Sequence, residues 1–347
     1  MSAETAGQDA ITDPIEYFLQ DLEYHGKSER TLNAYERVLR EFETFLDDQS
    51  DTPETLREVG SRDCLAWIHS LRGDVSSSTV ATYASYLHRF YAYMTQVGVF
   101  EENPMTVVVE QMNENIDTDP SRRDVSVPEM REFVDTISNP LDRVLVVTLL
   151  KTGMRVGELC NLDRRDLHLP FEEVDDVEIH PHLQGKPNSL FVSSEPAKEQ
   201  EYHGEVRTAS NKRKRDTVVP VDDELAAVLK RWLAVRPDPV SPADPLFMST
   251  DRWGKRITPH MVHHTVEEHA RDAGWYRTGG GTTENVTPHY FRHFFTTYLR
   301  AETGSRGVVQ YLRGDVAGEA VDTYTHNWGG LVRNVYEENI YRLFERI

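Results

Sequence analysis

Four residues of this 347-residue chain carry the side chains needed to cut a nucleic acid backbone. Arg155 lies in the motif T-G-M-R-V-G-E-L, His289 and Arg292 share H-Y-F-R, and Tyr324 follows Arg292 by 32 residues. A phenolic oxygen can attack a phosphodiester while two guanidinium groups bond the phosphate oxygens and stabilise their developing charge. Alone, an arginine is more often in a surface salt bridge, and a tyrosine in a core or interface. Together they predict strand cleavage by a tyrosine.

In order and spacing these motifs resemble those of the tyrosine recombinase family, also called the phage integrase family. The resemblance implies a site-specific recombinase or integrase that cleaves and rejoins duplex DNA through a 3′-phosphotyrosine and a Holliday junction. Tyr324 would be the nucleophile, and Arg155 and Arg292 would bind the phosphate. His289 would be the base or a phosphate donor, and Glu158 would brace the arginines. Because a tyrosyl ester keeps the bond energy, this enzyme would need no ATP, metal or other cofactor.

A lysine is expected to protonate the leaving 5′-oxygen. Family members place it on a β-hairpin turn, eight residues before a proline, and counting back from Pro220 gives Lys212. Lys214 is the alternative, and a solvated basic turn that grips phosphate without catalysis is another. We assign the neighbouring Arg213, Lys214 and Arg215 to DNA binding.

One position departs from the family pattern. Nine residues before the tyrosine, L-G-H is usual, whereas this chain has Arg313, Gly314 and Asp315. An ionised aspartate accepts hydrogen bonds but cannot donate one to a phosphate. We expect Asp315 to orient His289 or Arg155, and Arg313 to supply the missing donor. A DNA-binding protein on the same scaffold that does not cleave is therefore the alternative, followed by a related relaxing topoisomerase.

Helical periodicity fills the first third of the chain, with no pattern typical of strands. Three arginines share one sector of the second helix, opposite its apolar stripe, and we assign them to DNA binding: Arg30, Arg37 and Arg40. Helices are expected at Asp13–Tyr24, Ser28–Leu46, Arg62–Leu71 and Val80–Met94.

The later part of the chain mixes helical and strand patterns. An apolar helix at Leu141–Leu150 would deliver Arg155. Short β-favouring runs predict a small antiparallel sheet at Val174–Ile179, Ser189–Val192, Glu205–Thr208 and Thr217–Val221. Further helices are expected at Asp222–Val235, Thr258–Ala273, Pro288–Glu302 and Gly307–Leu312, with a final amphipathic stretch from Val332 to Phe344.

These patterns predict a mainly α protein of two domains. A disordered leader (1–12) precedes a helical, SAM-like core-binding domain (13–107) that clamps DNA, then a linker (108–124). An α+β catalytic domain of the integrase type follows (125–347), ending in an exchange helix. The resemblance implies a C-shaped clamp on double-stranded DNA. It also implies a monomer in free solution that forms homodimers and a homotetramer on DNA.

The charge balance is unusual for a DNA-binding protein. The chain has 58 acidic and 38 basic residues, a net charge of −20. Residues 1–120 hold 23 of the acids and 8 of the bases, and only 8 of the 38 bases are lysines. Such a surface is typical of proteins kept soluble in concentrated salt, where repulsion from DNA is screened. The composition favours a halophilic, haloarchaeal source over a mildly acidic mesophile.

The remaining signals favour a cytoplasmic protein. No apolar run is long enough to cross a membrane, and the N-terminus lacks a signal-peptide pattern. The two cysteines, Cys64 and Cys160, predict no disulfide framework. Four histidines between residues 260 and 269 are expected to face solvent or DNA, because no further ligands complete a zinc pattern.

Overall fold

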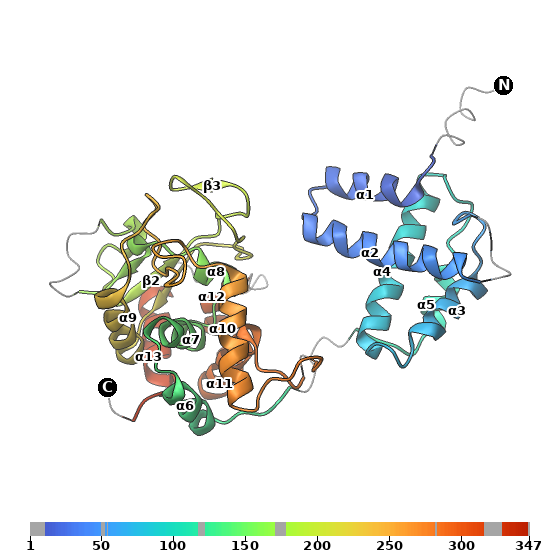
Figure 1. Cartoon of the computed structure of the whole chain (residues 1–347). Helices are drawn as coiled ribbons and strands as arrows, with labels where there is room; N and C mark the ends of the chain where they lie inside the picture. The colour runs from blue at the N-terminus through green and yellow to red at the C-terminus, as the bar shows by residue number, and fades with distance from the viewer. Residues whose placement is uncertain are drawn as a thin grey trace. The chain divides into compact units, whose positions relative to one another are not determined.

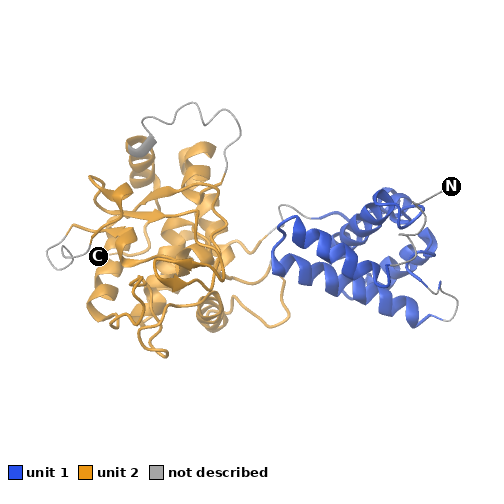
Figure 2. Ribbon diagram, turned by 90° about the horizontal axis from the view of Figure 1, so that it is seen from above, with its two compact units in different colours: residues 1–120 blue, residues 121–347 orange. Residues whose placement is uncertain are grey.

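The computed structural model describes residues 11–49, 53, 55–116, 122–170, 178–281, 283–315 and 328–345. The chain divides into two compact units, residues 1–120 (unit 1) and residues 121–347 (unit 2), shown in Figure 2. Helices dominate both units, and the strands of the described chain lie in unit 2 (Figure 1). This confirms the mainly helical fold with a small antiparallel sheet. Most of the expected leader, and most of the strand expected at 174–179, lie outside the described residues.

Two of the long helices of unit 1 begin directly after a serine that caps them. The Ser28 hydroxyl accepts a hydrogen bond from Thr31 N at 3.4 Å, and Ser76 accepts one from Thr79 N at 3.2 Å. The sequence predicts no further helix in unit 1 after Met94, yet one begins directly after Pro104, because a proline is tolerated where a helix begins. The helices are α1 (Pro14–Tyr24), α2 (Glu29–Asp47), α3 (Ser61–Leu71), α4 (Ser77–Gln96) and α5 (Met105–Gln111).

Aromatic rings from four helices fill the core of unit 1. The ring centroids of Phe18 on α1 and Phe90 on α4 lie 5.6 Å apart in an edge-to-face arrangement. Those of Phe42 on α2 and Trp67 on α3 lie 5.0 Å apart. All four side chains are fully buried. Because such rings bury large apolar areas in a defined geometry, they hold unit 1 around a core of its own.

The apolar helix α7 runs through the centre of unit 2, and α9, α10 and α11 pack against it (Figure 1). Every residue of α7 from Val144 to Thr152 is buried. A helix that is apolar on all sides needs neighbours on all sides, which is why the helices after the sheet gather around this one. The helices of unit 2 are α6 (Val127–Thr136), α7 (Pro140–Thr152), α8 (Val156–Cys160), α9 (Asp223–Val235), α10 (Pro259–Asp272), α11 (Pro288–Thr303), α12 (Arg306–Arg313) and α13 (Trp328–Asn339).

The sheet of unit 2 has the order β1-β2-β5, with antiparallel pairs throughout. Its strands are β1 (Leu167–His168), β2 (Ser189–Val192) and β5 (Thr217–Pro220), and Ser189 pairs with Pro220. A separate ribbon joins β3 (Glu201–Tyr202) to β4 (Glu205–Val206). The sequence predicted β2 with these bounds and β5 to within one residue. It missed β1 and β3, because two residues are too few to show an alternating pattern.

The C-terminal segment packs against the rest of unit 2. Val332, Tyr336 and Leu343 are buried in the main core, and the Tyr336 hydroxyl donates to the backbone oxygen of Lys151 at 2.9 Å. The expected amphipathic stretch therefore covers its own unit in this single chain, because its apolar face meets the end of α7. Its exchange between protomers stays a prediction. Every helix in the described part of the chain is too short or too polar to span a membrane.

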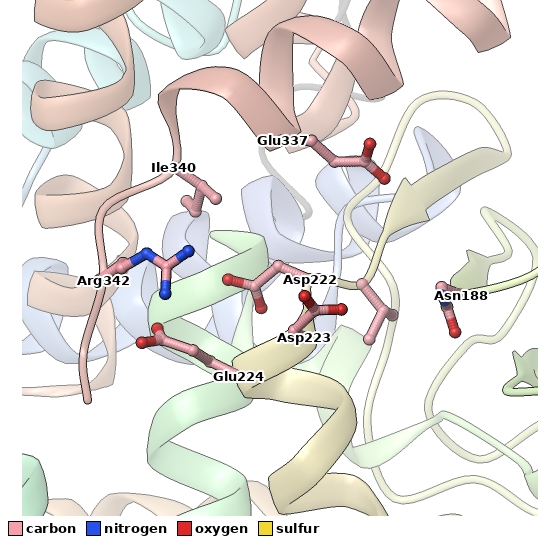
Figure 3. A pocket seen from close by; sticks show the side chains of 8 residues that line it. Asn188, Asp222, Asp223, Glu224, Glu337, Ile340 and Arg342 are labelled. Carbon is pink, nitrogen blue, oxygen red and sulfur yellow. The ribbon is translucent and has the colours of Figure 1, made fainter. Parts of the chain in front are cut away.

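Two carboxylates at the start of α9 hold the last residues in place. Glu224 accepts hydrogen bonds from the backbone N of Leu343 at 2.8 Å and of Phe344 at 3.0 Å. The buried Nζ of Lys151 lies 2.6 Å from carboxylate oxygens of both Asp222 and Glu224. Figure 3 shows these acids facing the tail across a small pocket. The residues after α13 are thus held against α7 and α9 by hydrogen bonds to charged side chains as well as by apolar contacts.

Candidate active site

Arg155 directly follows the end of α7. The helix ends at Gly153, whose φ of 60° is left-handed, and a Cβ there would lie 2.3 Å from the ring of Phe295 on α11. Glycine therefore lets α7 end against the helix that carries Arg292. The backbone N and Nη1 of Arg155 each donate to Glu158 at 3.0 Å. The motif T-G-x-R-x-x-E-L thus holds Arg155 by a turn on one side and a carboxylate on the other.

Arg292 is buried on α11. Its Nη1 donates to the backbone oxygen of Gly153 at 2.6 Å, and its Nη2 donates to that of Arg313 at 3.2 Å. Burial, and then the positive charges of Arg155 and Arg313, lower the pKa of Arg292 to about 9. The guanidinium therefore keeps its charge at neutral pH. A cation held in place with little solvent around it is suited to bind an anion strongly.

Asp315 joins the two arginines. Its Oδ1 lies 3.0 Å from Nη2 of Arg155 and 3.0 Å from Nη2 of Arg292, and its Oδ2 lies 2.9 Å from Nε of Arg313. Gly314, with a left-handed φ of 67°, ends α12 and turns the chain so that Asp315 reaches both. These contacts place Asp315 beside Arg155, and its orienting role stays a prediction. Among the described residues, no hydrogen bond joins Asp315 to a histidine.

A second carboxylate, Glu158, lies on the other side of Arg155. It is fully buried and also accepts from Nη2 of Arg213 at 3.0 Å. Arg213 is 3% exposed, and its Nη1 donates to the backbone oxygen of Leu312 at 3.1 Å. Its guanidinium is turned into the protein, unlike the surface DNA contact that the sequence predicts. The site therefore holds two carboxylates among four guanidinium groups, those of Arg155, Arg213, Arg292 and Arg313. The surplus of positive charge suits an anionic ligand.

His289 lies one helical turn before Arg292, at the surface of α11. Partial burial of the ring lowers its pKa, and the positive charges of Arg122, Arg292 and Arg313 lower it further. The imidazole is therefore neutral at physiological pH. A neutral imidazole can accept a proton, which is the property that a general base needs.

The basic segment after β4 contains Lys212, whose role as the general acid stays a prediction. Lys212 and Lys214 are exposed, and Lys214 N donates to the backbone oxygen of Gly314 at 3.2 Å. The Arg215 guanidinium lies 4.9 Å from the centre of the Tyr311 ring. Lys212 lies in an irregular segment between β4 and β5 and not on the turn of a simple hairpin. The reason is that the connection between β2 and β5 is long enough to form the β3–β4 ribbon within it.

The arginines expected to bind DNA in unit 1 differ in their partners. Arg30 is exposed. Arg37 donates to the Tyr83 hydroxyl at 2.7 Å, so α2 and α4 share this part of the surface. Arg40 is paired with Asp13 and with a second carboxylate, which offsets its charge. Their contacts with DNA stay predictions.

Tyr324 lies outside the described residues. The described residues nearest to it along the chain are Asp315, nine residues before it, and Trp328, four residues after it. Its role as nucleophile therefore stays a prediction.

The sequence did not point to two residues that hold the lysine segment. A Cβ on Gly157 would lie 2.6 Å from the backbone oxygen of Ser210, so the chain approaches α8 closely there. Asn161 Nδ2 donates to the backbone oxygen of Ala209 at 2.9 Å. A glycine inside a helix can have a packing reason, so Gly157 carried at most a weak signal. Nothing in the sequence marks Asn161.

Comparisons with known proteins identify the family of the chain. Residues 200–328 match the phage integrase family, and residues 15–98 match the phage integrase N-terminal SAM-like domain. The chain belongs to the phage integrase family of tyrosine recombinases. The tyrosine recombinase XerC of Thermodesulfovibrio yellowstonii is 27% identical over 312 residues, which cover 87% of each chain.

Solved structures show the integrase fold. The Tn1549 transposon integrase in complex with a circular intermediate DNA aligns with a TM-score of 0.63 at 17% identity, over 93% of this chain and 94% of that one. A lambda integrase from a tetramer bound to a Holliday junction aligns with a TM-score of 0.61 at 14% identity, over 88% of this chain and 77% of that one. Both alignments span most of the chain, so they confirm the predicted SAM-like and integrase-type parts.

Proposed function

We propose that this phage integrase family member is a site-specific recombinase that cleaves and rejoins duplex DNA. The observation that carries the proposal is the pair of arginines, Arg155 and Arg292, whose Nη2 atoms both lie 3.0 Å from one carboxylate oxygen of Asp315. Two guanidinium groups that meet on one anionic oxygen are close enough to share a phosphate. The similarity to a Xer tyrosine recombinase supports the same reaction.

In the proposed reaction, the Tyr324 oxygen forms a bond to the scissile phosphorus, and the bond from phosphorus to the 5′-oxygen breaks. His289 takes the phenolic proton, and Lys212 gives a proton to the departing 5′-oxygen. Arg155 and Arg292 stabilise the charge on the nonbridging oxygens. The products are a 3′-phosphotyrosine and a free 5′-hydroxyl. Rejoining is the reverse step with the 5′-hydroxyl of another strand, so the bond energy is conserved.

Asp315 takes a positioning role in this proposal. Its carboxylate accepts from Arg155 and Arg292 and has no proton to give to a phosphate when it is ionised. It fixes the two guanidinium groups side by side, and the adjacent Arg313 supplies the donor that a histidine provides elsewhere in the family. Glu158 also orients Arg155, from the other side of its guanidinium group.

Each unit would bind double-stranded DNA, with Arg30, Arg37 and Arg40 of unit 1 and Lys214 and Arg215 of unit 2 on phosphates. The recombinase would pair two DNA sites as dimers that join into a homotetramer. The lambda integrase neighbour is a tetramer on a Holliday junction, which supports this assembly. In that assembly α13 would pass to a neighbouring protomer.

Covalent trapping on a nicked suicide substrate tests the proposal. The protein should form a 3′-linked adduct that denaturing gels resolve, and the adduct should require one particular sequence. Specific binding without any adduct would instead favour the non-cleaving DNA-binding protein. Relaxation of supercoiled plasmid at many sequences, without exchange of strands between sites, would favour a topoisomerase.

We also propose that this recombinase works in concentrated salt, as in a haloarchaeal cytoplasm. The acid excess repels DNA at low ionic strength, and screening removes this repulsion while counterion release weakens direct contacts. DNA affinity should stay flat or pass through a maximum when KCl is titrated from ~0.1 to ~3 M, as followed by fluorescence anisotropy. A steep monotonic fall, in protein that is folded at the lowest salt, would remove the halophilic proposal.

A further inference from the structure

The segment that carries Lys212 is anchored to the core on its N-terminal side. Both Nη atoms of Arg207 donate to the buried carboxylate of Asp163, at 3.0 and 2.8 Å. Asn161 Nδ2 donates to the backbone oxygen of Ala209 at 2.9 Å and to Oδ1 of Asn211 at 2.8 Å. Asp163 and Asn161 both follow α8 within three residues. The chain is therefore tied to the end of α8 just before it reaches Lys212.

Gly157 brings the same segment close to Arg155. A Cβ on this glycine would lie only 2.6 Å from the backbone oxygen of Ser210. The backbone of Gly157 has an ordinary helical conformation, so space and not flexibility requires a glycine here. Arg155 is two residues away. The lysine segment thus lies directly on the first turn of the helix that follows the catalytic arginine.

Arg213 anchors the segment on the other side of Lys212. Its Nη2 donates to Glu158, which also holds Arg155, and its Nη1 donates to the backbone oxygen of Leu312. Its aliphatic stem lies against Gly314, where a Cβ would be 2.3 Å from Cγ of Arg213. The buried side chain of Arg213 therefore contacts both the helix after Arg155 and the turn before Asp315. Lys212 is the residue directly before Arg213 in the chain.

Lys212 itself has no comparable support. Its side chain is exposed, and its ammonium makes no hydrogen bond or ion pair with the described residues. A lysine side chain is a flexible stem with four carbons, so the position of its Cα decides which atoms its Nζ can reach. That position is fixed by the residues on either side, Asn211 and Arg213.

We propose that Arg213 is a positioning residue that sets Lys212 against the scissile phosphate by joining its segment to Glu158 and to the turn after α12. This inference deepens the proposed function and rests on the assignment of Lys212 as the general acid. Arg213 does not touch the substrate. Arg213 links the position of Lys212 to that of Arg155, because Glu158 bonds both arginines. One buried contact therefore fixes the phosphate-binding arginine and the acid relative to each other.

The test compares two suicide substrates, one with the normal 5′-oxygen and one with a 5′-sulfur at the scissile bond. The sulfur leaves without protonation, so it needs no general acid. Arg213→Gln should slow cleavage of the oxygen substrate ~10²-fold, the usual scale for a misplaced catalytic group. The sulfur substrate should be cleaved at nearly the wild-type rate. Arg213→Lys keeps the charge but cannot make both hydrogen bonds. Its rate on the oxygen substrate should lie between those of the wild type and Arg213→Gln.

Lys212→Ala and Lys214→Ala are the matched controls. Lys212→Ala should slow the oxygen substrate ~10²- to 10⁴-fold and be rescued by sulfur, as loss of a general acid requires. Lys214→Ala should keep the wild-type ratio of the two rates, since only the backbone of Lys214 contacts Gly314. If sulfur fails to rescue Lys212→Ala, the assignment of the acid is wrong. If it rescues Lys212→Ala but not Arg213→Gln, that assignment stands and the positioning role is wrong.

Gly157→Ala tests the same idea without changing a charge. The added Cβ must push Ser210, and with it the segment of Lys212, away from α8. The oxygen substrate should again be slowed and the sulfur substrate spared. This variant decides the question if Arg213→Gln does not fold. Equal slowing of both substrates would show that the contact serves Arg155 alone, and that result would overturn the proposal.

Discussion

The arginines of the two units have opposite surroundings. In unit 2, Arg213 and Arg292 are buried and each is bonded to protein atoms through both Nη groups. In unit 1, Arg30 is exposed, and the Arg37 side chain is 60% exposed. Buried charges in fixed positions act strongly on a ligand, whereas exposed charges are screened by water and salt. Changes at the buried arginines should therefore alter the chemistry, and changes at the exposed ones should tune binding.

The largest effect is expected for a change at Tyr324, which should abolish cleavage without weakening DNA binding. Tyr324→Phe removes only the phenolic oxygen, so we expect DNA binding at wild-type affinity and no covalent adduct. Gel-shift and suicide-substrate assays on the same preparation measure both. An adduct at the normal level in this variant would show that another residue is the nucleophile.

A buried arginine should not tolerate a lysine. Arg292→Lys keeps the charge but cannot bond Gly153 and Arg313 while it also bonds a phosphate. Single-turnover cleavage should fall ~10³-fold, near the cost of losing a preorganised donor to the transition state. Arg231→Lys, an exposed position on α9, is the control in the same unit. A loss of less than tenfold at Arg292 would remove the distinction between buried and exposed arginines.

The core of unit 2 should depend on its C-terminal helix. Tyr336→Ala removes a buried ring and its hydrogen bond to Lys151, and should cost about 3–5 kcal/mol of the free energy of unfolding. Tyr24→Ala in unit 1, where the ring is 85% exposed, should cost nearly nothing. Urea unfolding followed by circular dichroism measures both. A small cost at Tyr336 would show that α13 adds little to the stability of unit 2 in the single chain.

The state of His289 predicts a pH dependence. Partial burial and the nearby arginines lower its pKa from the ordinary value of 6.5, so the ring is neutral above that pH. Cleavage should be constant from pH 7 to 8 and fall ~10-fold per unit once the pH drops below the lowered pKa. The unfolded chain takes up the proton at higher pH than the folded one, so this group costs stability as the pH falls below about 6.5. A rate profile that His289→Gln leaves unchanged in shape would exclude His289 as the base.

The smallest effect is expected on the surface of unit 1. Arg37→Ala removes one exposed charge and its hydrogen bond to Tyr83, and should weaken DNA binding by roughly tenfold or less. The effect should shrink further at high salt, because the contact is screened. Anisotropy titrations at two KCl concentrations measure it. A hundredfold loss that persists at high salt would show that Arg37 acts as strongly as the buried arginines of unit 2.

Much of the site followed from local signals in the sequence. The left-handed turn at Gly153, the helix start at Pro288 and the spacing of His289 from Arg292 are decided by residues within one or two turns of each other. Ser28 and Ser76 cap their helices through backbone groups only three residues away, for the same reason. Short-range rules of capping and periodicity are readable without a structure because every partner is nearby in the chain.

What the sequence by itself determined is the order and spacing of the candidate reacting groups and the helices that carry most of those that the structure describes. What only the tertiary structure decided is which charges meet. Asp315 bonds Arg155 across 160 residues, and Arg213 bonds Glu158 across 55. A run of basic residues such as that around Arg213 reads as a DNA-binding surface, because composition does not say which side chain turns inward. Burial decides that, and burial depends on the packing of the whole unit.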